Sequence, residues 1–342
     1  MDYKPNYRIT PYLLNLIDEA GKLRAWIELA PLQVSWLPIL QKESRAKRAH
    51  FSTSIEGNPL TLPQVHALAR GEKIGAALAH ELEVVNYLNA MRWVESAPHQ
   101  KIDEKTIFAL HKIVTDGLLD NKKSGQYKIK QNYVVDENGI RQYTPTSPKD
   151  TPGAVKELLA WLNTPATQEL HSILACAIFH HRFVSIHPFS DGNGRLARAI
   201  GTLILYRREF DLHHIFSLDE FFAGNRQKYY QKLQQARELD GDLTYWIEYV
   251  AEGVVHTLHN VKKRIEGLQV TTSYPINLSV KQEETLRMLR DTQSLRGSDL
   301  IRSLKVTRAR VNQILTPLIK SGLVKKEGQS KATRYKLALY KN

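Results

Sequence analysis

One polar stretch between two apolar segments constrains how this chain folds. Residues 170–183 and 196–206 are rich in apolar side chains and poor in glycine, so each is predicted to be helical. Residues 187–198 lie between them and read HPFSDGNGRLAR, with two glycines in the middle. The pattern therefore predicts a helix, a glycine-containing loop and a second helix that begins at the loop.

The loop has the composition of a phosphate site. N–H groups at the start of a helix are unpaired, and the helix dipole adds partial positive charge. Arg195 and Arg198 are three residues apart, so they share a helical face and can hold a polyphosphate at two points. Asp191 is placed to hold a hard cation such as Mg²⁺ beside those phosphates. His187 can accept a proton from a hydroxyl near neutral pH, so the stretch predicts attack on a nucleotide phosphate.

Other known motifs do not fit the same stretch. A Walker loop needs Gly-Lys followed by Ser or Thr, and the stretch lacks this sequence. An EF-hand loop beginning at Asp191 needs glycine where the chain has Leu196. Zinc at His180, His181 and His187 is not favoured, because no Cys or acidic ligand follows at a suitable spacing.

Residues 187–198 resemble the signature of the Fic family, HxFx(D/E)GNGRxxR, and match it at every specified position. The resemblance implies a protein adenylyltransferase that moves AMP from ATP to Ser, Thr or Tyr hydroxyls. It implies His187 as the general base and Asp191 as the Mg²⁺ ligand. The phosphate loop and the clamps on the β- and γ-phosphates are then Gly192, Asn193, Gly194, Arg195 and Arg198.

A second motif precedes this region. Ser52, Glu56 and Gly57 match the inhibitory pattern (S/T)xxxE(G/N) of one regulatory class of Fic proteins. Taken alone, Glu56 is interpreted as a solvated surface charge, because most glutamates are exposed. The resemblance instead implies that Glu56 pairs with Arg198 and occupies the place of the ATP γ-phosphate. We therefore expect autoinhibition through Ser52, Glu56 and Arg198.

Residues 127–143 interrupt the helical pattern. Alternating side chains over 127–135, a turn at 136–139 and a return over 140–143 predict a β-hairpin. One interpretation is a surface hairpin without a function. The other is a resemblance to the Fic flap, on which a target protein pairs as an added strand near Tyr133. Lys128 stands where the family often has arginine.

Residues 225–239 form a further predicted helix that carries two adjacent tyrosines. This segment resembles the adenine-side helix of Fic proteins, which implies that Tyr229 contacts the nucleotide. Arg237 stands where the family sometimes has asparagine, so the contacts to adenosine stay open.

Most of the formal net charge of +13 belongs to the end of the chain. Residues 276–342 hold 15 Lys and Arg against 5 Asp and Glu, a net charge of +10. Predicted helices at 283–290, 298–304 and 308–321, then strands at 323–326 and 333–337, resemble a winged helix-turn-helix. Arg308 and Arg310 begin the third helix, which makes DNA a candidate partner. Protein contacts or dimerisation through the same fold stay open.

The length of 342 residues favours two or three domains. We expect a mainly α chain: an N-terminal helical region with the inhibitory helix (1–100), a Fic core with a β-hairpin flap (101–268) and a winged-helix domain (276–342). A homodimer and a nucleotide other than ATP stay open. So does the alternative of a DNA-binding regulator that uses its Fic core as a nucleotide sensor.

The expected location is the cytoplasm. Cys176 is the single cysteine, so no internal disulfide can form, which suits a reducing compartment. The first residues are polar and show no signal pattern. No apolar run approaches the ~20 residues that a membrane helix needs, so we expect a soluble protein without a membrane partner.

Overall fold

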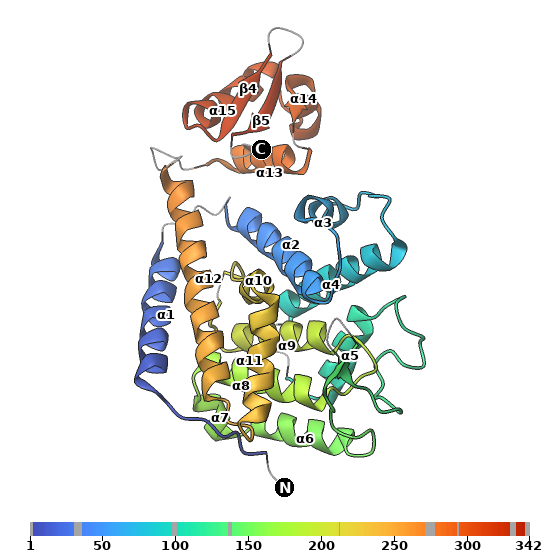
Figure 1. Cartoon of the computed structure of the whole chain (residues 1–342). Helices are drawn as coiled ribbons and strands as arrows, with labels where there is room; N and C mark the ends of the chain where they lie inside the picture. Colours follow the sequence, from blue (N-terminus) through green and yellow to red (C-terminus); the bar gives the residue numbers. More distant parts are fainter. Residues whose placement is uncertain are drawn as a thin grey trace. The chain divides into compact units, whose positions relative to one another are not determined.

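The structure, a computed structural model, describes residues 3–30, 36–97, 101–135, 139–211, 213–270, 278–292, 294–328 and 333–338. It is mainly helical (Figure 1). The chain divides into two compact units. The first unit comprises Met1–Leu29 and Leu40–Val261, and the second, here called the tail unit, comprises Ala30–Ile39 and Lys262–Asn342. All residues predicted for the phosphate site lie in the first unit.

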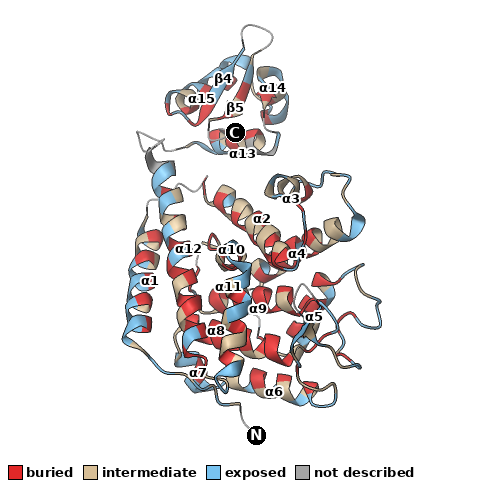
Figure 2. Ribbon diagram, viewed as in Figure 1, coloured by how far each residue is buried: buried red, intermediate tan, exposed pale blue. Residues whose placement is uncertain are grey.

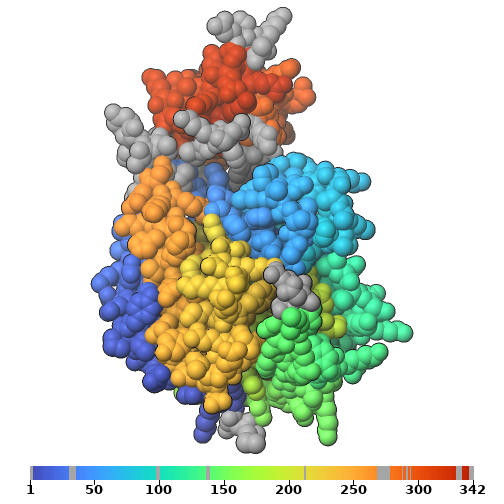
Figure 3. All heavy atoms as spheres, viewed as in Figure 1, coloured from blue at the N-terminus to red at the C-terminus, as the bar shows by residue number. Residues whose placement is uncertain are grey.

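Two buried helices form the centre of the first unit. They are α8 (Ser172–Ile186) and α9 (Asn193–Arg207), and 13 of the 15 residues of α8 are buried (Figure 2). A helix that is apolar on all sides is stable only when other elements surround it. Helices α4 (Leu78–Ser96), α5 (Glu104–Val114) and α6 (Thr151–Leu162) pack against this pair, and side chains fill the spaces between the ribbons (Figure 3).

The remaining long helices are α1 (Pro11–Leu29), α2 (Leu37–Ile55), α11 (Arg226–Glu238) and α12 (Thr244–Val270). Of these, α1 and α2 lie in the predicted N-terminal helical region, and α11 corresponds to the helix predicted at 225–239. Three short helices were not predicted, because eight residues or fewer give too little periodicity: α3 (Leu62–Ala69), α7 (Pro165–Glu169) and α10 (Leu218–Gly224). Among the described residues, no helix combines the length and the apolar character needed to cross a bilayer.

The flap, residues 127–143, contains much less β-structure than the alternation predicts. Within the described part of the flap, only β1 (Val134–Val135) and β2 (Arg141–Tyr143) pair, in antiparallel orientation and with an irregular register. Lys128 and Asn132 bond to the loop before α9 instead of to a partner strand: the Lys128 N–H donates to the Pro188 carbonyl at 2.9 Å, and Asn132 Nδ2 donates to the Phe189 carbonyl at 2.8 Å. Most of the predicted turn, residues 136–138, lies outside the described residues.

Among its described residues, the tail unit contains three complete helices and three short strands, besides the first residues of α2 and the end of α12. Its elements are α13 (Val280–Thr292), β3 (Leu295–Arg296), α14 (Gly297–Leu304), α15 (Arg308–Lys320), β4 (Val324–Glu327) and β5 (Arg334–Leu337). The strands form an antiparallel sheet in the order β3-β5-β4, and Thr307 caps α15 by accepting the Arg310 N–H. The two-residue strand β3 was not predicted. The winged-helix assignment stays a prediction, and most of the wing turn lies outside the described residues.

Candidate active site

Two reversals of the backbone join α8 to α9. His187 ends α8 in the left-handed conformation, with φ 51° and ψ 62°, and its N–H donates to the Phe183 carbonyl at 2.9 Å. A non-glycine residue rarely adopts this conformation. Gly192 precedes α9 with φ 77°, and a Cβ there would lie 3.0 Å from Thr115 Cγ2. Residues 187–192, here called the signature loop, therefore need glycine at their last position.

Buried contacts fix the signature loop. Asn193 accepts the Phe189 N–H and donates to the Phe189 carbonyl, both at 2.9 Å. The Phe189 ring is buried and stacks on His111, with centroids 3.8 Å apart. Because the Gly125 N–H donates to His111 Nδ1, the other ring nitrogen is protonated and donates to the Asp191 carbonyl at 3.0 Å. Burial lowers the pKa of His111 to about 4, so this bridge stays neutral.

The catalytic candidate His187 is half-buried at the start of this loop. Burial, assisted by the positive charge of Lys128, lowers the pKa of His187 to about 4. The imidazole is therefore neutral at physiological pH, as a proton acceptor must be. Its Nδ1 lies 2.8 Å from Asn132 Nδ2 and 3.3 Å from Asn193 Nδ2.

The structure brings Ser52 and Glu56 to Arg198. Arg198 Nε donates to Ser52 Oγ at 2.7 Å, and Nη2 donates to the Ser52 carbonyl at 2.8 Å. Nη2 also lies 2.7 Å from Glu56 Oε1. The Arg198 side chain is 2% exposed and that of Glu56 is 30% exposed, so the pair lies at the edge of the interior. Asp219, which the sequence analysis missed, adds a second carboxylate 3.5 Å from Nε.

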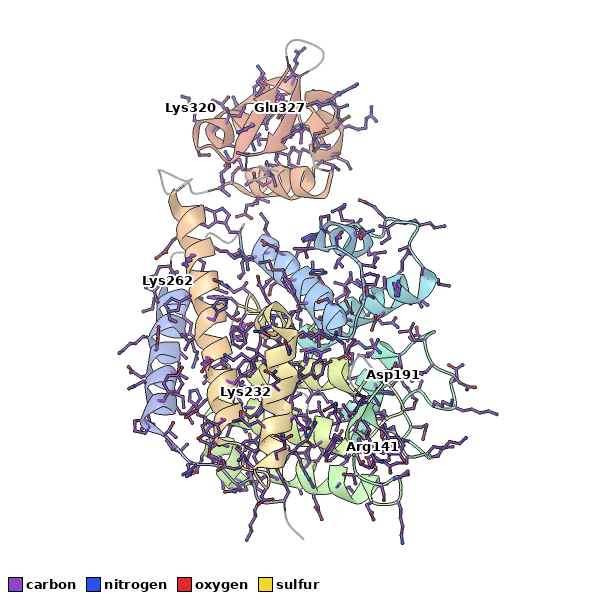
Figure 4. All side chains as sticks on the ribbon, in the orientation of Figure 1. Arg141, Asp191, Lys232, Lys262, Lys320 and Glu327 are labelled. Atoms are coloured by element: carbon purple, nitrogen blue, oxygen red, sulfur yellow. The ribbon has the colours of Figure 1, made fainter. Side chains whose placement is uncertain are left out.

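The other arginine of the signature is also held by two carboxylates. Arg195 lies 2.8 Å from Glu83 Oε1 and 3.0 Å from Asp191 Oδ2, and its side chain is 5% exposed. Glu83 of α4 also accepts a hydrogen bond from Asn58 at 2.7 Å. The sequence analysis missed Glu83, because nothing in its surrounding sequence distinguishes it from a surface acid. Asp191, labelled in Figure 4, is 60% exposed and can turn to another partner.

The space over Gly194 has the properties of an anion site, and we call it the anion cradle. It comprises Gly194, Arg198 and the N-terminal end of α9. A Cβ at Gly194 would collide with Glu56 Oε1 and would lie 3.1 Å from Arg198 Nη1. Within the described part of the chain, that buried Nη1 has no hydrogen-bond partner. A carboxylate of the chain itself thus lies where a phosphate oxygen would satisfy the free donor.

The chemistry of the donors also fits a magnesium ion. Mg²⁺ usually keeps several waters and binds through one or two carboxylates together with substrate phosphates. Asp191 is a single, largely exposed carboxylate next to the anion cradle in the sequence, and it suits this role. Among the described residues, no group of three or more His, Cys, Asp or Glu side chains could hold a metal by itself.

The two adjacent tyrosines of α11 differ in their surroundings. Tyr229 is buried, and its hydroxyl lies 2.8 Å from His180 Nε2. Tyr230 is partly exposed and donates to the Ile55 carbonyl at 3.4 Å, next to Glu56. The structure therefore brings Tyr230 to the edge of the anion cradle. The nucleotide contact of Tyr229 stays a prediction.

Comparisons with known proteins agree with the resemblance. Residues 101–205 match the model of the Fic/DOC family, so the chain contains a Fic domain. Protein adenylyltransferase Fic of Nematostella vectensis is 30% identical over 249 residues, which are 71% of this chain and 53% of that protein. Protein adenylyltransferase fic-1 of Caenorhabditis elegans is 28% identical over 70% of this chain and 44% of its own length. The chain spans about half the length of these relatives.

Solved structures show the same fold. A Fic family protein from Desulfovibrio desulfuricans G20 aligns over 99% of this chain and 100% of its own, with a TM-score of 0.72 and 24% identity. Residues 134–508 of C. elegans Fic-1 align over 77% of this chain and 73% of that chain, with a TM-score of 0.61 and 26% identity. The helical architecture around the signature loop is therefore that of Fic proteins.

Proposed function

We propose that this chain, with its Fic domain, is a protein adenylyltransferase that transfers AMP from ATP to a Ser, Thr or Tyr hydroxyl. The acceptor belongs to a target protein or to the chain itself. The names of the relatives support AMP transfer. The observation that carries the proposal is the anion cradle. There the Glu56 carboxylate lies 2.7 Å from Arg198 and directly over Gly194, where any side chain would collide with it.

In the proposed reaction, the acceptor oxygen attacks the α-phosphorus of ATP and pyrophosphate leaves. The hydroxyl O–H bond breaks and its proton passes to His187. N–H groups at the start of α9 and Asn193 stabilise the charge that develops on the phosphate. Arg195 and Arg198 hold the β- and γ-phosphates. Mg²⁺, held by Asp191, would neutralise phosphate charge when it is bound.

The flap supports docking of a protein target. Ile129, Tyr133 and Val135 are exposed apolar side chains on or beside β1. Exposed apolar side chains beside a short, open strand edge suit an extended peptide that pairs as an added strand. We propose that the acceptor segment binds here, near Tyr133. A cytoplasmic location is part of the same proposal.

Autoinhibition is the regulatory part of the proposal. While Glu56 bonds to Arg198, the γ-phosphate of ATP cannot use the same guanidinium. The test is intact-mass analysis after incubation with Mg²⁺ and each nucleoside triphosphate in turn. We expect Glu56→Gly to gain the mass of AMP from ATP and wild type to gain little, because removing the carboxylate frees the anion cradle.

Two further variants make this test specific. Glu72→Gly removes a glutamate whose arginine partner, Arg70, lies outside the site, and it should behave as wild type. Adding His187→Ala to Glu56→Gly should abolish labelling. Failure of Glu56→Gly to label itself or any protein of a cell extract, with any of the nucleotides, would refute the proposed function.

The basic tail unit supports a second candidate function, that of a DNA-binding regulator with the Fic core as a nucleotide sensor. Arg308, Arg310 and Asn312 are exposed at the start of α15, where recognition helices contact DNA. The full chain should bind duplex DNA in fluorescence anisotropy with a steep salt dependence. Arg308→Ala with Arg310→Ala should weaken binding. Absence of binding to duplex DNA at low salt would exclude DNA as the partner, and equal affinity of wild type and the double variant would exclude the start of α15 as the contact.

A further inference from the structure

A side chain of the flap, that of Asn132, contacts His187, the proposed proton acceptor. Asn132 Nδ2 lies 2.8 Å from His187 Nδ1 and 2.8 Å from the Phe189 carbonyl oxygen. On the other side of the same amide, Oδ1 accepts a hydrogen bond from Lys128 Nζ at 2.8 Å. Asn132 is therefore bonded on both sides while it touches the imidazole.

These neighbours determine which way the amide faces. An ammonium group only donates and a carbonyl only accepts, so Oδ1 of Asn132 faces Lys128 and Nδ2 faces Phe189. Nδ2 then donates to His187 Nδ1. The Asn193 amide is oriented in the same way by the N–H and the carbonyl of Phe189, and its Nδ2 lies 3.3 Å from the same ring nitrogen.

A ring nitrogen that receives two donors carries a lone pair and no proton. The neutral imidazole must then carry its proton on the other nitrogen, Nε2. An Nε2–H group cannot take a proton from an acceptor hydroxyl, and Nδ1 is covered by the two amides. Within the described residues, no side chain or backbone group accepts a hydrogen bond from Nε2. The hydrogen bonds around His187 thus select the tautomer that does not serve as a base through its free nitrogen.

We propose that Asn132 is a positioning residue that holds His187 in the Nε2-protonated tautomer and slows AMP transfer until Asn132 leaves Nδ1. This inference rests on the proposed role of His187 as proton acceptor. Regulation through Asn132 is separate from autoinhibition through Glu56, because Asn132 acts on the proton acceptor and Glu56 acts on the phosphate site. Docking of a target on the flap would displace Asn132, because the proposed docking site near Tyr133 and Asn132 belong to the same segment.

Serine proteases show the size that such an effect can reach. There, an amide in place of the carboxylate behind the catalytic histidine selects the wrong tautomer and lowers kcat by about 10⁴-fold. In this chain the amide is the natural side chain. Asn132→Asp should select the opposite tautomer of His187, because a carboxylate only accepts hydrogen bonds and therefore favours a proton on Nδ1. Nε2 is then free to accept the proton of the hydroxyl.

The first measurement reads the tautomer directly, without turnover. The full chain is labelled with ¹⁵N-histidine, His187 is assigned by comparison with His187→Gln, and the shifts of both ring nitrogens are recorded at neutral pH. We expect a protonated Nε2 in wild type and a protonated Nδ1 in Asn132→Asp, a change in the tautomer ratio of at least about tenfold. In Asn132→Ala only the longer contact from Asn193 remains, so the two tautomers should mix.

Gln131→Ala is the matched control. Its side chain donates to the Asn132 and Pro145 carbonyls and has no bond to the imidazole. It loosens the flap without changing the donors at Nδ1, so the wild-type tautomer should remain. A protonated Nδ1 in wild type, or the same tautomer in wild type and both Asn132 variants, would overturn the inference.

The second measurement is AMP transfer in the Glu56→Gly background. We expect Asn132→Asp to raise kcat by about tenfold or more with little change in KM for ATP, because the phosphate site is untouched. A purely structural role of Asn132 predicts a lower kcat instead, and that result would refute the inference. Absence of transfer in every variant would refute the proposed function, while the tautomer measurement still decides the role of Asn132.

Discussion

Replacing Glu56 with glutamine or glycine tests the proposed autoinhibition, in which both the charge and the bulk of this side chain would oppose ATP binding. Glutamine keeps the size of the side chain and a hydrogen-bond acceptor but removes the negative charge. Glycine removes the charge and the bulk together. We expect the affinity for Mg·ATP to rise from wild type to Glu56→Gln and again to Glu56→Gly.

The geometry sets the size of the change. The contact of 2.7 Å joins a guanidinium that is 2% exposed to a carboxylate that is 30% exposed. A charge-assisted hydrogen bond of this kind contributes about 1.5–3 kcal/mol, and ATP must break it to reach Arg198. Removing it should therefore lower the Kd by about 10- to 150-fold. Glutamine retains a weaker neutral hydrogen bond of about 0.5–1.5 kcal/mol, so its Kd should fall between the two limits.

Isothermal titration calorimetry with Mg·ATP measures this directly. All proteins carry His187→Ala, so that no AMP is transferred during the titration. Glu72→Gly serves as the control for loss of an acidic side chain paired with arginine elsewhere. Equal Kd values for wild type, Glu56→Gln and Glu56→Gly would show that the ion pair does not compete with ATP, and the reasoning would fail.

Three other variants or conditions test neighbouring parts of the structure. Gly194→Ala should not gain ATP affinity in the same calorimetric assay, because the added methyl group fills the anion cradle even after the blocking carboxylate moves. Arg48→Ala should lower the free energy of unfolding by about 3–5 kcal/mol in urea titrations, since it leaves Asp211 buried without its ion-pair partner at 3.4 Å. Burial lowers the pKa of His111, His181 and His187 to about 4 in the folded chain, from 6.5. The unfolded chain therefore binds more protons below pH 6.5, and urea titrations should show stability falling toward pH 4, by about 4 kcal/mol per pH unit at the steepest point. Stability that is constant between these pH values, an Arg48→Ala protein as stable as wild type, or tighter ATP binding by Gly194→Ala would contradict the respective argument.

The helices could be predicted because their signals are local. The apolar periodicity of 170–183 and 196–206 reports burial, and the glycines between them report the break, so α8, α9 and the signature loop follow from short windows of sequence. The flap could not be predicted in the same way. Its alternation is typical of a strand, but the Lys128 N–H and the Asn132 side chain bond to the signature loop, which lies more than fifty residues further along the chain. Those non-local bonds replace the ladder that the pattern predicts.

The residues that the sequence analysis missed share a physical reason. Glu83, His111 and Asp219 each obtain their role from a partner far away in the chain: Arg195, the Asp191 carbonyl and Arg198. None of them belongs to a motif, and a single acid or histidine on a helix is usually a solvated or packed side chain. Only the fold brings them to the signature.

In the proposed autoinhibition, the two carboxylates at Arg198 have different functions: Asp219 stabilises the buried guanidinium, and Glu56 controls the access of phosphate to it. Asp219 is almost fully buried, lies 3.5 Å from Nε and accepts a hydrogen bond from the Tyr87 hydroxyl at 3.4 Å. A buried guanidinium without any anionic partner is strongly destabilising, so displacement of Glu56 by ATP, as proposed, requires a second partner that stays bonded to Arg198. Asp219 supplies it from the interior, and Ser52 holds Nε in place. The partly exposed Glu56 is then the partner that a phosphate could replace. When Glu56 leaves, the guanidinium is still paired with Asp219, and Nη2 becomes available to the phosphate.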